Sequence, residues 1–265
     1  MRDYVAPIQG DVQSSCMFEP PTIAENIRRV EKKLLAACQR AGRPEGEVKL
    51  MAVSKTHPAQ AIADAAAAGV RLFGENRVQE FQQKSLELNG LGVHVAVGAD
   101  GDSAVHVHLI GHLQSNKAAR AAEIFTGVDT VDSLKLALRL DEAGDKLGRR
   151  LPVLLEIKVS EEAAKTGLEP ASTELADLLE RLPDLRHLQM RGLMTVAPLD
   201  DNPETARNCF RELRQLRERF AARYPGLDFD ELSMGMSGDF EIAIEEGSTL
   251  VRIGTAIFGS RPKPA

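Results

Sequence analysis

Eight short apolar runs alternate with longer amphipathic stretches along most of this chain. We expect strands at residues 48–54, 70–73, 105–110, 128–131, 153–159, 188–196, 231–233 and 249–253. The helices expected between them cover residues 58–68, 75–88, 114–125, 133–146, 173–182, 204–224 and 239–246. Parallel strands need such crossover helices, so the alternation favours an α/β fold. Eight units in 265 residues predict a single (β/α)8 TIM barrel.

An extra helix is expected before the first strand. Thr22 and Glu25 have the spacing of a capping box, and apolar residues repeat at helical spacing up to about residue 41. We therefore expect residues 1–20 to be a flexible N-terminal extension and residues 21–265 to be the barrel domain. An open doubly wound sheet is the alternative fold. The usual dinucleotide fingerprint is missing, because the glycines at 90 and 92 have no third glycine after them.

Charge and composition exclude several classes of protein. The net charge is −6, which speaks against binding to nucleic acid or to an acidic membrane surface. No apolar run reaches 18 residues, and residues 1–20 lack the pattern of a secretory signal. The cysteines number 3 and lie far apart, as expected of reduced thiols. We expect a cytoplasmic protein that binds neither nucleic acid nor a membrane.

Lys55 stands at the carboxyl end of the first expected strand. In an α/β barrel, that position lies at the face where ligands bind. Partial burial there lowers the pKa of an amine and frees it as a nucleophile that forms Schiff bases with aldehydes, pyridoxal phosphate among them. The alternative is a lysine that only solvates the barrel rim, and its position alone does not decide between the two.

The last two βα connections resemble a phosphate site. Ser237 precedes the helix expected at residues 239–246, and a helix N-terminus favours anions. Gly254 and Thr255 follow the eighth strand, where glycine permits close approach and threonine supplies a hydroxyl. The loops after strands seven and eight often bind phosphate in this fold. Taken singly, Ser237 fits a helix cap and Gly254 fits a turn, but their placement beside Lys55 favours a phosphate site.

A metal site is not expected. Among the histidines only His108 and His112 have a spacing that suits a metal, and Gly111 between them falls at a strand end rather than on one helical turn. The arginines and glutamates of residues 204–224 alternate as on a solvated helix face.

Six segments, taken in order, resemble the pyridoxal phosphate homeostasis protein family. They are AVSKT (52–56), FGENRVQE (73–80), HLIGHLQSNK (108–117), KTG (165–167), SMGMS (233–237) and VRIGTAIFG (251–259). The resemblance extends over roughly residues 23–261. The resemblance implies a barrel similar to the N-terminal domain of alanine racemase. It also implies a protein that binds pyridoxal 5′-phosphate without an established enzymatic reaction.

The resemblance also assigns roles to individual residues. Lys55 resembles the lysine that forms the Schiff base, and Asn76 resembles a residue near the cofactor ring. The phosphate cradle would consist of Ser237, Gly254 and Thr255. Arg252 resembles the partner of the pyridine nitrogen. Because arginine can only donate hydrogen bonds, it would keep that nitrogen unprotonated and weaken carbanion chemistry.

The chain departs from the family in a few places. Arg77 stands where the family usually has tyrosine, which leaves one contact beside the ring in doubt. Residues 1–20 and 90–103 have no clear family counterpart, and the second of these segments is expected to be an exposed loop.

The expected function is therefore to buffer or deliver the cofactor, with cofactor-dependent apoenzymes as recipients, and the expected state is a monomer. We do not expect an enzyme. A racemase is the alternative, but residues 254–265 are too few for its second domain, and Tyr4 and Tyr224 lie far from the expected site. A Schiff-base aldolase is the third possibility, which the position of Lys55 on the first strand disfavours.

Overall fold

Eight parallel strands form a closed barrel in this computed structural model, which describes residues 21–97, 104–159 and 166–260. The strands are β1 (Lys49–Val53), β2 (Leu72–Glu75), β3 (His106–Leu109), β4 (Gly127–Val131), β5 (Leu151–Glu156), β6 (Leu188–Met194), β7 (Glu231–Ser233) and β8 (Leu250–Ile253). Each strand pairs with the next one in the chain, and β8 returns to β1 with Ala52 opposite Ile253. The predicted TIM barrel is confirmed, and the open sheet is excluded.

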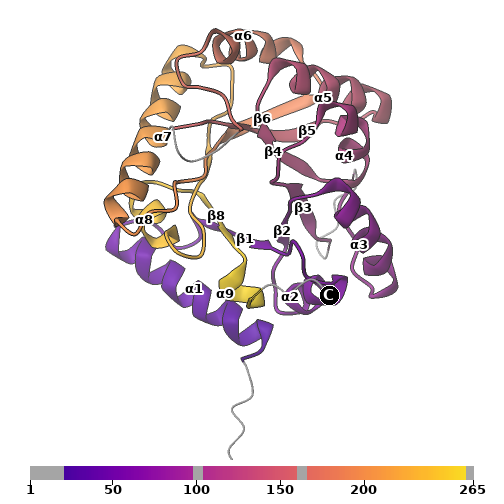
Figure 1. The fold of residues 1–265 in the computed structure, drawn as a ribbon, viewed down its shortest axis with the longest axis vertical. Helices are drawn as coiled ribbons and strands as arrows, with labels where there is room; N and C mark the ends of the chain where they lie inside the picture. The colour runs from indigo at the N-terminus through magenta and orange to yellow at the C-terminus, as the bar shows by residue number, and fades with distance from the viewer. Residues whose placement is uncertain (1–20, 98–103, 160–165, 261–265) are drawn as a thin grey trace, which may run out of the picture.

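Helices surround the ring of strands (Figure 1). They are α1 (Ile23–Arg40), α2 (Ala59–Ala67), α3 (Val78–Gly90), α4 (Ala118–Ile124), α5 (Leu134–Leu147), α6 (Thr173–Arg181), α7 (Pro203–Arg223), α8 (Phe240–Glu245) and α9 (Thr255–Phe258). Two 3₁₀ turns, η1 (Ser115–Lys117) and η2 (Leu182–Asp184), precede α4 and follow α6. The helices turn their apolar sides inward, as α7 does by burying Phe210, Leu213 and Leu216.

The first helix lies against the last ones. The expected capping box is present, since Thr22 Oγ1 accepts from the Glu25 amide while the Glu25 carboxylate accepts from the Thr22 amide. From this start α1 runs alongside α8 and α9 (Figure 1). Asn26 Nδ2 donates a 2.9 Å hydrogen bond to the carbonyl of Ile257. The two ends of the described chain are therefore joined where the barrel closes.

Several predicted boundaries were wrong. The helix predicted from residue 75 begins at Val78, because Glu75 is the buried last residue of β2. The stretch predicted as one helix over 114–125 divides into η1 and α4. The short helix α9 was not predicted. In the loop expected at 90–103, Gly90 ends α3 and Val95 bridges to Val105. The expected extension at residues 1–20 lies outside the described residues.

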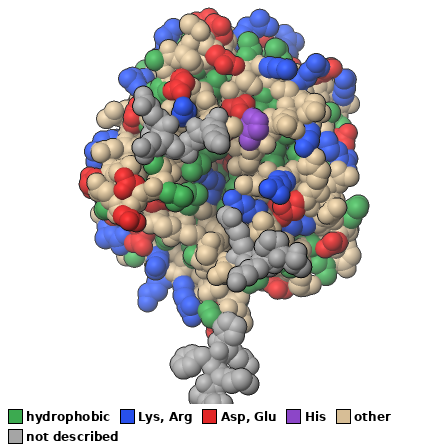
Figure 2. All heavy atoms as spheres, viewed as in Figure 1, with side chains coloured by type: hydrophobic (Ala, Val, Ile, Leu, Met, Phe, Trp, Pro, Cys, Tyr) green, Lys and Arg blue, Asp and Glu red, His purple; other side chains and the backbone are tan. Residues whose placement is uncertain are grey.

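Charges of both signs are interspersed over the face seen in Figure 2, with no large area of one sign. Ion pairs join neighbouring turns of several helices, as Lys146 does with Glu142 at 2.8 Å. Within the described parts of the chain, no helix is long and apolar enough to cross a membrane.

Candidate functional site

The residues predicted to bind a ligand gather at the carboxyl end of the barrel. Lys55 follows β1 and Asn76 follows β2, and these strands pair with Val53 opposite Gly74. Gly254 follows β8 on the other side of β1. Because all strands run parallel, their carboxyl ends open at one mouth, which is where this fold places its ligands.

Lys55 is half-buried in the turn between β1 and α2. The residues on either side of it are tightly held. The amide of Ser54 donates to the Gly74 carbonyl at 3.1 Å, and the Ser54 side chain is fully buried. Thr56 has a φ of 66° and is the one non-glycine residue with positive φ in the described chain. The backbone around Lys55 is therefore constrained on both sides.

The predicted phosphate residues are close neighbours, although not in the expected way. Ser237 lies two residues before Asp239, the residue that precedes α8, so it does not cap that helix. Its hydroxyl instead faces α9 and accepts a long 3.5 Å hydrogen bond from the amide of Ala256. Gly254 packs against β1, where an added Cβ would lie 3.3 Å from the Val53 carbonyl oxygen. Thr255 is exposed beside it.

Arg252 points from β8 into the barrel and is only 4% exposed. One guanidinium nitrogen, Nη1, lies 2.7 Å from both the carbonyl and the hydroxyl of Ser233. The other, Nη2, donates to the Thr195 carbonyl at 2.8 Å. The guanidinium group is thus fixed by β7 and by the residue that follows β6. Burial lowers the pKa of Arg252, but an arginine remains cationic in proteins.

Three acidic residues act on the charge of Arg252, namely Asp129, Asp239 and Glu156. Burial raises the pKa of Asp239, while a hydrogen bond from the Met236 amide and the charge of Arg252 oppose that rise. Burial also raises the pKa of Glu156 at the end of β5, against a 3.2 Å hydrogen bond from the Thr166 hydroxyl. The mouth of the barrel therefore combines a fixed cation with carboxyl groups whose pKa is raised by burial.

Asn76 is half-buried, and its Oδ1 has no hydrogen-bond partner among the described residues. Across a cavity of about 310 Å³ it faces residues that follow β3, including His112. The His112 Nδ1 lies 3.0 Å from Asp132 Oδ2. Sequence reasoning missed Asp132 and Glu156. Asp132 directly follows an expected strand, which could have identified it, whereas Glu156 fell inside the strand expected at 153–159 and ends β5 only in the structure.

The two histidines considered for a metal do not converge. His108 Nδ1 lies 2.9 Å from Asp129 Oδ1, whereas His112 pairs with a different aspartate. Burial lowers the pKa of His108, but the carboxylate of Asp129 outweighs it and raises that pKa overall. Within residues 21–97, 104–159 and 166–260, no group of three or more metal-ligating side chains is suitably arranged.

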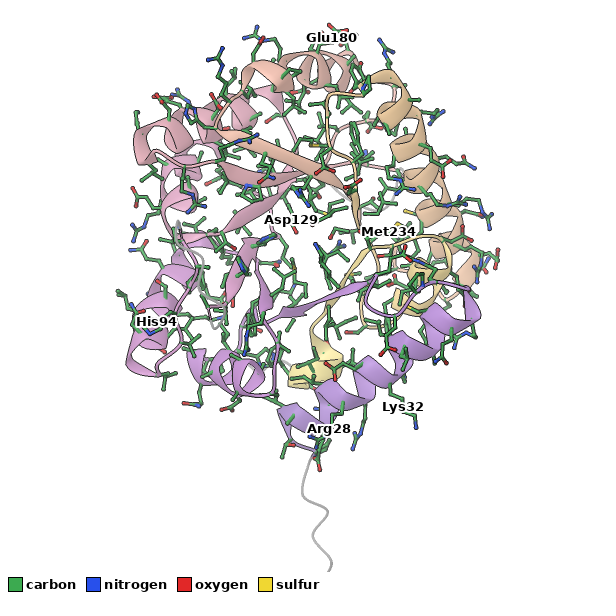
Figure 3. All side chains as sticks on the ribbon, turned by 180° about the vertical axis from the view of Figure 1, so that it is seen from behind. Arg28, Lys32, His94, Asp129, Glu180 and Met234 are labelled. Atoms are coloured by element: carbon green, nitrogen blue, oxygen red, sulfur yellow. The ribbon has the colours of Figure 1, made fainter. Side chains whose placement is uncertain are left out.

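A second cavity of about 300 Å³ opens at the amino end of the barrel, with Asp129 on its wall. Figure 3 shows Asp129 toward the middle of the molecule, seen from behind, and Glu180 at its edge. Three of its charged groups bind one another: Lys49 lies 2.8 Å from Glu231, and Arg191 is 3.7 Å from the same carboxylate. The residues predicted to bind a ligand lie at the opposite end, so the candidate site is the carboxyl mouth.

Comparisons with known proteins agree with the barrel fold described above. Residues 22–262 match the family described as "Alanine racemase, N-terminal domain". The Pyridoxal phosphate homeostasis protein of Vibrio cholerae is 42% identical over 241 residues, which cover 91% of this chain and 97% of that protein. The protein of the same name from Escherichia coli is 44% identical over 242 residues, with 90% and 97% coverage.

Solved structures extend the comparison. PipY of Synechococcus elongatus with PLP bound is 41% identical and superposes with a TM-score of 0.71, covering 87% of this chain and 100% of that one. An alanine racemase of Clostridium difficile is 15% identical, has a TM-score of 0.62 and shares the fold alone, with 88% of this chain matching 57% of that one. This chain belongs to the pyridoxal phosphate homeostasis protein family, on the barrel that alanine racemases carry as their N-terminal domain.

Proposed function

We propose that this protein binds pyridoxal 5′-phosphate at the carboxyl mouth of its barrel and takes part in homeostasis of the cofactor. Residues 21–265 would form the one cofactor-binding domain. The relatives that match over nearly their whole length are named for this role, and PipY was solved with the cofactor. The observation that carries the proposal is the convergence of Lys55, Gly254 and Arg252 on one end of the barrel.

The residues at the mouth fit the cofactor. Gly254 lets its connection pack closely against Val53, and the hydroxyls of Ser237 and Thr255 lie on the last two βα connections as donors for a phosphate. The Ser237 hydroxyl accepts only one long hydrogen bond within the described structure, so its own proton is available to donate. These three residues are proposed as the phosphate cradle.

Lys55 is proposed to hold the aldehyde. Its amine nitrogen would bond to the aldehyde carbon as a Schiff base, and the carbonyl oxygen would leave as water. Asn76, with its unpartnered oxygen, would lie beside the ring. When bound, the cofactor supplies an electron-withdrawing ring that can stabilise a carbanion.

Arg252 would limit that chemistry. A guanidinium has five N–H donors, and the hydrogen bonds to Ser233 and Thr195 leave donors for the pyridine nitrogen. A donor at this position keeps the ring nitrogen unprotonated, which weakens its capacity to accept electrons. We therefore propose that the protein holds and releases the cofactor without efficient amino-acid turnover. Cofactor-dependent apoenzymes would receive it, and the protein would act as a monomer.

The test is the near-visible absorption spectrum of the purified protein with added cofactor, followed by borohydride reduction and peptide mapping. We expect a yellow protein and a pyridoxyl group on Lys55. Lys158 is the control. It follows β5 as Lys55 follows β1, but its amine pairs with the Glu169 carboxylate at 3.0 Å. Colourless protein, or a label mainly on Lys158 or on Lys165, which lies outside the described residues, would contradict the proposal.

The relationship to racemases makes racemisation the second candidate. Racemases need a base on each face of the substrate. Tyr224 follows the outer helix α7 and lies under the Arg223 guanidinium at 5.3 Å, away from the mouth. Chiral chromatography after incubation with L-alanine or D-alanine decides the matter. Turnover near the enzyme median of about 10 per second, abolished by Lys55→Ala, would favour the racemase.

A further inference from the structure

A buried lysine lies directly behind the turn that carries Lys55. Lys84 belongs to α3 and is 6% exposed. Its Nζ lies 2.7 Å from Glu75 Oε1, 2.8 Å from Glu80 Oε1 and 2.9 Å from the Ser54 carbonyl oxygen. An ammonium group has three N–H donors, and these three oxygens accept them. The position of the Lys84 side chain is therefore fully determined by its hydrogen bonds.

The same carboxylates hold both neighbours of Lys55. The Ser54 hydroxyl donates to Glu75 Oε1 at 2.7 Å, and the Thr56 amide donates to Glu80 Oε1 at 2.5 Å. Lys84 joins the two carboxylates. We call Ser54, Glu75, Glu80 and Lys84 the Lys84 clamp. It attaches the residue before Lys55 and the residue after it to β2 and α3.

The backbone at this turn needs such support. Thr56 adopts a φ of 66°, a region that β-branched residues avoid because their side chains crowd the backbone there. Conformations of this kind persist only where the surroundings hold them, and they gather at functional sites. The hydrogen bond from the Thr56 amide to Glu80 is one such restraint.

Charge makes Lys84 the central member of the clamp. Burial raises the pKa of Glu75, and the Lys84 ammonium opposes that rise. Burial acts in the same direction on Glu80, but hydrogen bonds from Lys84 and from the Thr56 amide hold the pKa of that carboxyl below its usual value. Glu75 is fully buried and its Oε2 has no partner in the described structure. Without Lys84, the two carboxyl groups would lose their shared cation.

We propose that Lys84 is a positioning residue for the cofactor lysine. The Lys84 clamp fixes the Ser54–Thr56 turn so that the Lys55 amine meets the cofactor aldehyde in a reactive orientation. This inference rests on the proposed function. In the step concerned, the Lys55 nitrogen gives up its protons and bonds to the aldehyde carbon, and the aldehyde oxygen leaves as water. The clamp does not touch Ser237, Gly254 or Thr255, so it acts on covalent attachment rather than on phosphate binding.

The experiment separates those two quantities. Lys84→Met is mixed with excess cofactor, total bound cofactor is measured by rapid filtration, and covalent attachment is followed by borohydride trapping over time. We expect bound cofactor to persist while trapping on Lys55 slows roughly ten- to a hundredfold, the loss that a displacement of about 1 Å can cause. Lys84→Arg retains a cation with several donors, so it should recover part of the rate. Lys146→Met removes an exposed ion pair of 2.8 Å on α5 and should leave the rate unchanged.

Glu80→Gln provides a second test if Lys84→Met does not fold. The Glu80 side chain is 24% exposed, so its replacement disturbs the core little. It loses the charge that holds the Thr56 amide, and we expect slower trapping with bound cofactor retained. Parental trapping rates in the variants that fold would overturn the inference. So would bound cofactor and trapping that fall in equal proportion, since this indicates only a structural role. A parent protein that binds no cofactor refutes the proposed function instead.

Discussion

Truncating Ser237 to alanine should weaken cofactor binding much more than it weakens the fold. A hydrogen bond to a charged group contributes about 1.5–3 kcal/mol, so losing one to the phosphate should raise the dissociation constant roughly 10- to 150-fold. Within the protein, the Ser237 hydroxyl accepts one hydrogen bond from the Ala256 amide at 3.5 Å. So long a bond is weak, and its loss should lower the free energy of unfolding by about 0.5 kcal/mol or less.

The assay compares two ligands on two proteins. Apoprotein is titrated with pyridoxal 5′-phosphate and with pyridoxal, which has the same aldehyde but no phosphate. If Ser237 binds the phosphate, the substitution should weaken binding of the first ligand and leave the second nearly unchanged. Ser85→Ala is the control, because it removes a hydroxyl that donates to the Gln82 carbonyl at 2.9 Å within α3. An equal loss of affinity for both ligands, or no loss for either, would refute the phosphate assignment.

The remaining predictions concern three other positions. Gly254→Val should weaken cofactor binding more than Ser237→Ala does, because its Cβ would lie 3.3 Å from the Val53 carbonyl oxygen and displace the connection that carries Thr255; a parental dissociation constant in titration would place the phosphate elsewhere. Gly111→Ala should lower the free energy of unfolding in urea by about 1–3 kcal/mol, because its Cβ would lie 2.3 Å from the Asn76 carbonyl oxygen. Gly90→Ala has no atom within 4 Å of the new Cβ and is the control. Burial raises the pKa of Cys209 to about 11, so the folded thiol keeps its proton after the unfolded thiol has lost it. The contribution of Cys209 to stability is therefore complete below about pH 9 and falls by roughly 2–3 kcal/mol as the pH rises to about 11. Urea unfolding should show a smaller loss over that range for Cys209→Ala than for the parent, and equal losses would contradict the burial effect.

The barrel could be predicted from sequence because its pattern is local. Each strand is a short apolar run and each helix carries an apolar stripe, so both appear in consecutive residues. Lys55 and Gly254 could be placed at one mouth because parallel strands fix which end each connection occupies. The direction of side chains could not be read in this way. The hydroxyl of Ser237 turns to α9, a helix the sequence did not suggest, instead of capping the helix that follows it.

The interior charges were also missed, and for a physical reason. Glu75 was placed at the start of the helix expected at 75–88, whereas the three-dimensional fold ends β2 at Glu75 and brings Lys84 to it at 2.7 Å. Their separation of nine residues matches neither a helical nor a strand period. Tertiary contact between β2 and α3 therefore decided the environment of Glu75.

The closure of β8 against β1 also affects when the protein can acquire its ligand. Lys55 is synthesised well before Gly254 and Thr255, which lie far along the chain but beside it in the barrel. Until that part of the chain is made, β1 lacks one neighbour and α1 lacks the Ile257 carbonyl that Asn26 binds. Contacts between such distant residues form late because closing long loops costs chain entropy. If Lys55 and the residues after β8 bind the cofactor as proposed, a nascent chain would carry the lysine before the phosphate cradle exists, so cofactor capture would follow the closure of the barrel.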